Sequence, residues 1–200
     1  MRATLAMLIC ILFMGCQSPQ TKEEENVPHT AADKAAANTS VSFILPDGFM
    51  GRSQKGAYIV YSDSVEKHNG HNVSTIKAVN PVSFATILNN LTPQKCIGQR
   101  IKYTAWVRCK DVANWAGLWL RIDPSDPRHN PNLGFDNMHN RPIKGTADWT
   151  KYEIVMDVPE GAANVVYGAL LDGGGQIWID SIEVKIVDKL TPTTTSTKVL

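Results

Sequence analysis

The chain has 200 residues, and its 20 Lys and Arg residues against 19 Asp and Glu residues give a formal net charge of +1. This balance argues against nucleic acid or an anionic lipid surface as an electrostatic partner. Residues 16–40, after an apolar N-terminal run, and residues 189–200 are poor in large apolar side chains. The remaining region has about 150 residues, a common size for a single domain.

The first residues have the features of a secretory signal. Arg2 supplies a positive charge and residues 5–14 form an apolar run that is too short to span a bilayer. Residues 13–16, Phe-Met-Gly-Cys, resemble the bacterial lipobox, in which a small residue precedes the cysteine that receives diacylglycerol. We therefore predict a signal peptide over residues 1–15 and a lipid on Cys16. The alternative is an ordinary cleaved signal in which this cysteine is incidental.

A lipid on Cys16 would make the protein an exported lipoprotein attached to a membrane. In a Gram-negative host, Gln17 after the cysteine predicts the periplasmic face of the outer membrane, because the sorting rule for inner-membrane retention uses Asp at that position. Acyl chains give durable attachment, since each buried CH₂ contributes about 0.8 kcal/mol.

Two segments lack the apolar residues that a folded core requires. Residues 16–40 are polar and rich in Ala and Glu, and they predict a flexible linker. Residues 189–200 are rich in Thr and predict a disordered tail. The folded domain is accordingly expected over residues 41–188.

The domain shows the alternation of apolar and polar residues that is typical of β-strands, and no stretch carries a sustained helical stripe. Turn sequences rich in Gly and Pro separate the strands, as in residues 159–161 and 172–175. The pattern predicts an all-β sandwich or barrel. Its expected inner faces consist of Ile101, Tyr103, Ala105 and Val107; Leu118, Leu120 and Ile122; Tyr152, Ile154 and Met156; Val165, Tyr167, Ala169 and Leu171; and Ile177, Ile179, Ile182, Val184 and Ile186.

The opposite faces of three of these strands carry aromatic and charged residues. They are Trp106, Trp119, Arg121, Asp123, Trp178 and Asp180. Tryptophan stacks on the C–H faces of sugars, and Arg and Asp bind hydroxyl groups, so such a face could bind a carbohydrate or a peptide. The alternative is that the tryptophans are buried under loops or the second sheet, with Arg121 paired to an aspartate.

From about residue 56 to residue 187 the chain resembles a galactose-binding-like jelly-roll module that occurs behind bacterial helix-turn-helix regulators and in exported proteins. The matching stretches are residues 98–107, 115–123, 135–138, 141–146, 148–149 and 178–180. The resemblance implies a two-sheet jelly-roll β-sandwich. It does not imply one function, because a fold of this kind serves many functions.

The resemblance also implies that residues 135–145 form a loop and strand near Trp119 and Arg121. It thereby adds Asp136, Asn137 and Arg141 to the candidate surface. A structural role is the alternative, with Asp136 and Arg141 forming an ion pair that holds the loop. The predicted ligand-binding residues are Trp106, Trp119, Arg121, Asp136, Asn137 and Arg141.

The sequence contains no Gly-x-Ser-x-Gly nucleophile elbow, no phosphate-binding Gly-rich loop, no His-Glu-x-x-His and no Cys-x-x-Cys. His68 and His71 flank an Asn-Gly turn without an evident third ligand, and we predict no metal and no cofactor. Cys96 and Cys109 are joined by a segment that reads as an extended strand, which separates their sulfurs too widely for a disulfide.

The sequence thus favours a non-catalytic binding module for a glycan, a cell-wall fragment or an envelope protein partner. A structural or assembly protein of the cell envelope is the second hypothesis. An enzyme acting on polysaccharides is the third.

Overall fold

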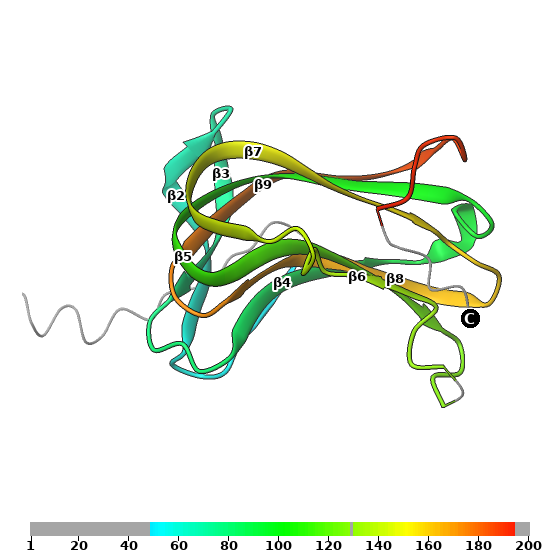
Figure 1. Cartoon of the computed structure of the whole chain (residues 1–200), viewed down its shortest axis with the longest axis horizontal. Helices are drawn as coiled ribbons and strands as arrows, with labels where there is room; N and C mark the ends of the chain where they lie inside the picture. The colour runs from blue at the N-terminus through cyan, green and yellow to red at the C-terminus, as the bar shows by residue number, and fades with distance from the viewer. Residues whose placement is uncertain (1–48, 129, 195–200) are drawn as a thin grey trace, which may run out of the picture. The chain divides into compact units, whose positions relative to one another are not determined.

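The computed structural model describes residues 49–128 and 130–194. The predicted signal peptide, Cys16 and the linker over residues 16–40 lie outside the described residues. The described part is all-β, as predicted, with one short 3₁₀ turn (Figure 1). Its elements are β1 (Met50–Arg52), β2 (Tyr58–His68), β3 (His71–Ala78), β4 (Phe84–Leu91), η1 (Pro93–Lys95), β5 (Arg100–Pro124), β6 (Gly134–Asp136), β7 (Ile143–Asp157), β8 (Ala162–Asp172) and β9 (Gln176–Val187).

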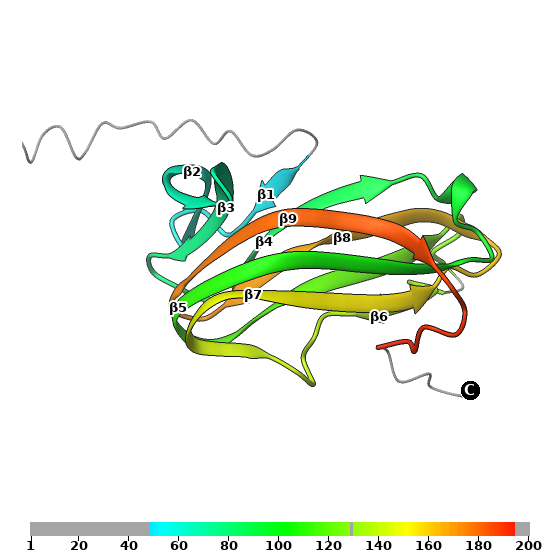
Figure 2. The same cartoon turned by 90° about the horizontal axis from the view of Figure 1, so that it is seen from above.

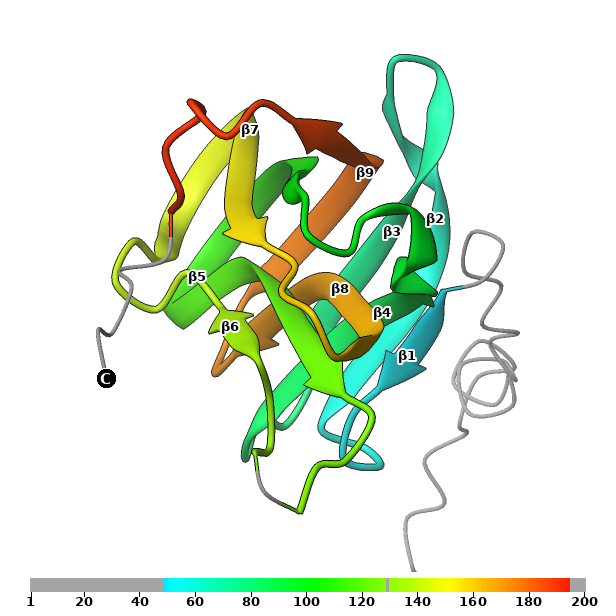
Figure 3. The same cartoon turned by 90° about the vertical axis from the view of Figure 1, so that its right-hand side faces the viewer.

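The strands form two sheets that share β5. Residues 100–110 of β5 pair with β7 and β9, and the order β7-β5-β9-β3-β2 makes the first sheet. Residues 115–124 of β5 pair with β8, and the order β6-β5-β8-β4-β1 makes the second sheet. The end-on view shows these two layers (Figure 3). The domain is a two-sheet jelly-roll β-sandwich, which confirms the predicted fold class.

The sequence suggested separate strands for residues 100–108 and 118–123, but β5 runs through both. Its pairing with β7 breaks register at three places between Val107 and Ala116, and Asp111 adopts a positive φ of 52°. Such irregularities bend and twist a strand without ending it. The chain can therefore pass from the first sheet to the second while it remains hydrogen-bonded along much of β7, which lies beside it in Figure 2.

The predicted inner faces supply most of the core between the sheets. Tyr103, Leu120 and Leu171 have no exposed surface. The buried hydroxyl of Tyr103 donates a 2.9 Å hydrogen bond to the carbonyl oxygen of Gly168, so that it is not left unpaired across the core. In β9 the apolar residues change from odd to even positions at Ser181, which has a positive φ of 51° and coincides with a register break against β5. This extra residue keeps Ile182 and Val184 packed against the core, whereas Ile186, which was also expected on the inner face, is 50% exposed near the end of the strand.

The end of the described chain differs from the predicted tail at residues 189–200. Arg100 donates two hydrogen bonds, each 2.6 Å long, to the carbonyl oxygens of Lys189 and Thr191. Thr194 exchanges hydrogen bonds with the backbone of Val155 and donates one to Asp136. Residues 189–194 therefore lie against the domain, because these polar contacts replace the apolar burial that their composition lacks.

Cys96 and Cys109 are both free and buried. Residues 49–128 and 130–194 contain no helix suited to crossing a membrane.

Candidate functional site

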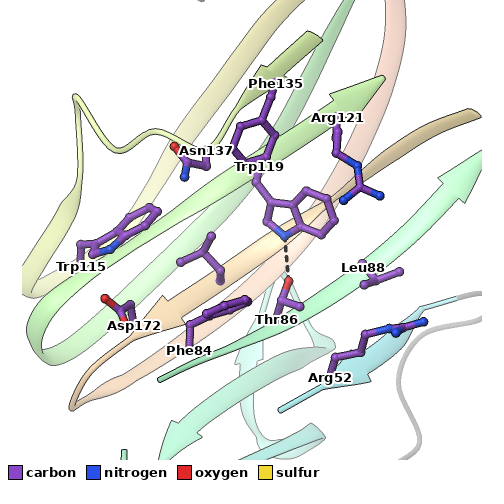
Figure 4. Close-up of a pocket in the computed structure, with 11 residues that line it drawn as sticks. Arg52, Phe84, Thr86, Leu88, Trp115, Trp119, Arg121, Phe135, Asn137 and Asp172 are labelled. Carbon is purple, nitrogen blue, oxygen red and sulfur yellow. Dashed lines mark hydrogen bonds between the residues drawn. The ribbon is translucent and has the colours of Figure 1, made fainter. Parts of the chain in front are cut away.

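A groove with a volume of about 550 Å³ lies on the outer face of the second sheet (Figure 4). A second hollow of about 360 Å³ shares four lining residues with it, Arg52, Leu88, Trp119 and Arg121, so the two form one continuous depression. We call the two together the outer groove. It is lined by Arg52, Phe84, Thr86, Leu88, Trp115, Trp119, Arg121, Phe135, Asn137, Leu170 and Asp172, and the second hollow adds Met50, Asn90, Asp123, Asn164 and Val166.

Strand alternation explains why these side chains share one face. Thr86 lies opposite Arg52 on one side and Leu170 on the other, so β1, β4 and β8 contribute in register. Trp119 and Leu88 both lie opposite Gly168. Since Gly168 has no side chain, the indole of Trp119 can extend across β8 and donate a 2.7 Å hydrogen bond to Oγ1 of Thr86 on β4.

Trp119 forms the floor of the outer groove rather than a free platform. Its side chain is only 7% exposed and packs with Val166 and Leu170 in a small apolar cluster. Of the two interpretations of Trp119 in the sequence analysis, the buried side chain is therefore closer to the structure than the exposed one. Burial removes most of the ring from solvent, and its single N–H is already paired with Thr86.

Two exposed aromatic rings of the outer groove come from strands other than β5. Phe84 on β4 is 53% exposed and Phe135 on β6 is 45% exposed, and both line the outer groove. Trp115 is half-buried and meets the ring of His139 edge-on at a centroid distance of 5.4 Å. Exposed aromatic residues around a depression are available for contact with a ligand, because their apolar surface is not buried by the fold.

Charged groups lie at both ends of the first hollow of the outer groove. Arg121 binds Asp123 through two hydrogen bonds of 2.6 and 3.0 Å. Asp172 accepts a hydrogen bond from the side-chain amide of Asn114 at the end near Trp115. Arg52 is exposed and makes no ion pair or hydrogen bond through its side chain in the described part of the chain.

Trp106, one of the predicted binding residues, lies away from the outer groove. It faces outward as the alternation predicts, but from the part of β5 that belongs to the first sheet. The ring of His68 contacts Trp106 and Trp149 at centroid distances of 5.3 and 4.3 Å, and its Nδ1 lies 2.7 Å from Oδ2 of Asp180. The alternation of the sequence predicted correctly that Trp106 faces outward, but it did not predict on which sheet. Trp106 and Trp119 lie on different sheets and therefore do not form one surface.

Asp136 and Arg141 form the ion pair that the sequence analysis considered as the alternative to ligand binding. Two hydrogen bonds of 3.0 and 2.7 Å join the guanidinium to both carboxylate oxygens. Burial raises the pKa of Asp136, but hydrogen bonds from Arg141, from the N–H of Met138 and from the hydroxyl of Thr194 outweigh it and hold the pKa below its ordinary value. The carboxylate is fully engaged in holding the loop after β6.

Three of the six predicted residues therefore line the outer groove: Trp119, Arg121 and Asn137. Sequence reasoning missed Arg52, Phe84, Trp115, Phe135 and Asp172. Trp115 is an even number of residues from Trp119 and Arg121 on β5, so all three side chains face the same way. That spacing could have identified Trp115 as a candidate binding residue. Arg52 comes from the three-residue strand β1, which is too short to produce an alternation signal.

Within residues 49–128 and 130–194, no three His, Cys, Asp or Glu side chains gather in a group that could hold a metal ion. His68, considered as half of a metal pair in the sequence, is engaged with Asp180 instead.

Comparison with known proteins agrees with a jelly-roll sandwich of this kind. No protein-family model matches the chain. A 111-residue stretch is 39% identical to the uncharacterized HTH-type transcriptional regulator YbfP of Bacillus subtilis (strain 168), and it comprises 56% of this chain. The match spans only 37% of that regulator. The similarity therefore concerns one part of a longer protein.

Solved structures share the fold at low sequence identity. The C-terminal family 22 carbohydrate-binding module of Clostridium thermocellum Xyn10B superposes with a TM-score of 0.52 and 15% identity, over 74% of this chain and 89% of that module. The enzymatically active domain of tailspike protein 4 from bacteriophage CBA120 gives a TM-score of 0.53 and 11% identity, over 70% of this chain and 20% of that one. At these identities the likeness establishes the fold alone.

Proposed function

We propose that the domain is a non-catalytic binding module that holds a glycan in the outer groove, and that a lipid on Cys16 attaches it to a membrane. The observation that carries the binding proposal is the combination of exposed aromatic rings and polar groups around one continuous depression. Binding sites for small molecules are typically concave and apolar, with a few polar groups that fix orientation. The outer groove has this composition.

The chemistry of the groove suits sugar rings. Phe84, Phe135 and Trp115 offer apolar surfaces to the C–H faces of a sugar. Asn137 and Asp172 offer hydrogen-bonding groups to its hydroxyls. Binding requires no covalent chemistry of these residues. The structurally similar module of Clostridium thermocellum Xyn10B is a carbohydrate-binding module, which supports the proposal.

The test is binding of the purified protein to a panel of soluble glycans and cell-wall fragments, measured by isothermal titration calorimetry. Trp115→Ala should weaken binding of the best glycan by about tenfold or more, because tryptophan is enriched among the contact residues whose truncation costs about 2 kcal/mol or more. Trp106→Ala is the matched control, since it removes the same side chain from the outer face of the first sheet. Absence of binding to any glycan would refute the proposal.

A protein partner is the second candidate function. Met50, Phe84 and Phe135 are large apolar residues that remain 45 to 53% exposed and line the outer groove. Exposed apolar surface of this kind also occurs in protein interfaces. If no glycan binds, crosslinking in intact cells through a photoreactive residue at position 84 would identify a protein neighbour. The same residue in place of Val65, which is 91% exposed on β2 and outside the groove, is the control and would not.

A further inference from the structure

Two arginines lie at one end of the first hollow, where it joins the second, one on each side of Leu88 (Figure 4). Arg52 reaches this end from β1 and Arg121 reaches it from β5, and both line each of the two hollows. Asp172 lies at the other end, next to Trp115 (Figure 4). Positive charge therefore lies at one end of the first hollow and negative charge at the other.

The hydrogen-bonding capacity of the two guanidinium groups is largely unused. Nε and Nη2 of Arg121 bind Asp123, and its Nη1 makes no hydrogen bond within the described residues. Arg52 makes none through its side chain in the same part of the chain. A guanidinium has five N–H donors in a planar fork that matches a carboxylate. Such donors beside an apolar wall are suited to an anionic group on a ligand.

The charge at this end limits which anion fits. Arg52 and Arg121 contribute two positive charges and Asp123 contributes one negative charge, which leaves a net charge of +1. One carboxylate on a bound sugar would neutralise this end. A dianionic phosphate would leave this end with a net negative charge, and it would be repelled by the carboxylate of Asp123.

We propose that the outer groove selects glycans that carry carboxylates, namely polymers that contain hexuronic acid units, and that Arg52 is the residue that determines this selection. This inference rests on the proposed glycan-binding function. The aromatic rings around the groove contact the sugar faces, and Arg52 binds the carboxylate of a sugar unit at the β1 end. Arg121 is the secondary contact, because Asp123 already occupies two of its nitrogens.

The experiment compares charged and neutral forms of the same polymer. Affinities of the full-length protein are measured by affinity electrophoresis for polygalacturonate, alginate and hyaluronate, each beside its carboxyl-reduced derivative. We expect at least one uronic-acid polymer to bind about tenfold more tightly than its reduced form. In Arg52→Gln this ratio should fall to about one. Arg128→Gln, which removes an exposed arginine outside the groove, should preserve it.

Two results separate the failure of this inference from that of the proposed function. If reduced polymers bind as tightly as charged ones, or if Arg52→Gln keeps the preference, the selection is refuted while glycan binding stands. If no polymer binds in either form, and no neutral glycan binds, both proposals are refuted.

Discussion

The indole N–H of Trp119 on β5 donates a 2.7 Å hydrogen bond to Oγ1 of Thr86 on β4, across the intervening strand β8. The same hydroxyl lies 2.8 Å from the carbonyl oxygen of Ala169 and can donate to it. Trp119 and Thr86 are both buried. Because solvent cannot replace these bonds, they hold the floor of the outer groove in one arrangement.

Replacing Thr86 by Val should therefore destabilise the domain. The shape is nearly preserved, but the buried N–H of Trp119 loses its acceptor, which costs about 1 to 3 kcal/mol. The free energy of unfolding is measured by urea titration with tryptophan fluorescence. Thr86→Ser keeps the hydroxyl and should retain most of the stability, and equal losses in both variants would argue against the hydrogen bond.

Replacing Gly168 by Ala should be more damaging than a surface glycine substitution. An added Cβ would lie 1.9 Å from the carbonyl oxygen of Ile87, so the paired strands β4 and β8 would have to separate. We expect a loss of about 3 kcal/mol in the free energy of unfolding. At Gly174 the nearest atom to an added Cβ is the Cβ of Ala113 at 3.6 Å, and the same substitution there should have little effect.

The ion pair of Asp136 predicts an acid-sensitive contribution to stability. The folded pKa of Asp136 is lowered, so its contribution is present above the unfolded pKa of about 3.9 and is lost as the pH falls through the folded value. Asp136→Asn should lower the free energy of unfolding by about 2 kcal/mol at pH 7. The gap between wild type and variant should narrow below about pH 4 in thermal unfolding experiments.

Asp148→Asn provides the control for this pH series. The side chain of Asp148 is 89% exposed and its nearest cationic atom, Nε of Arg108, is 3.9 Å away. Exposed pairs contribute little to stability, so this variant should follow the wild type at every pH. A gap for Asp136→Asn that stays constant down to pH 2 would contradict the role assigned to its ionised form.

The proposed lipid on Cys16 predicts the fraction in which the protein is found. Wild type should sediment with membranes, and Cys16→Ser should appear in the soluble exported fraction or keep its signal peptide. Mass spectrometry of the N-terminal peptide should show a diacylglyceryl cysteine in the wild type only. A membrane-bound Cys16→Ser variant without its signal would contradict lipid attachment at this residue.

Alternation is a local property, so the sequence was sufficient to predict an all-β sandwich or barrel, and the resemblance implied the two-sheet jelly roll. The inward set on β5, which includes Ile101 and Leu120, is buried as expected. The two tryptophans of the outward set could not be assigned to a sheet in the same way. β5 changes sheets between Trp106 and Trp119, and only the long-range pairings with β9 and β8 reveal the change.

The candidate site was predicted in part for a related reason. Arg121 and Asn137 belong to segments near each other in the resemblance, and both line the groove. Arg52 and Phe84 come from β1 and β4, which carry no chemical motif and join the groove because β4 pairs with β8 and β1 pairs with β4. The role of Asp136 depended on whether Arg141 forms an ion pair with it. The conformation of the loop between them decides this, and the sequence pattern does not predict that conformation.

Since β5 belongs to both sheets, the floor of the outer groove and the centre of the first sheet are formed by one uninterrupted strand. A ligand that binds only the folded domain stabilises it by mass action, by about 2.7 kcal/mol at one hundred times its dissociation constant. Occupancy of the groove should consequently slow amide hydrogen exchange on β9 and β3, which contribute no residue to the groove, as well as on β8.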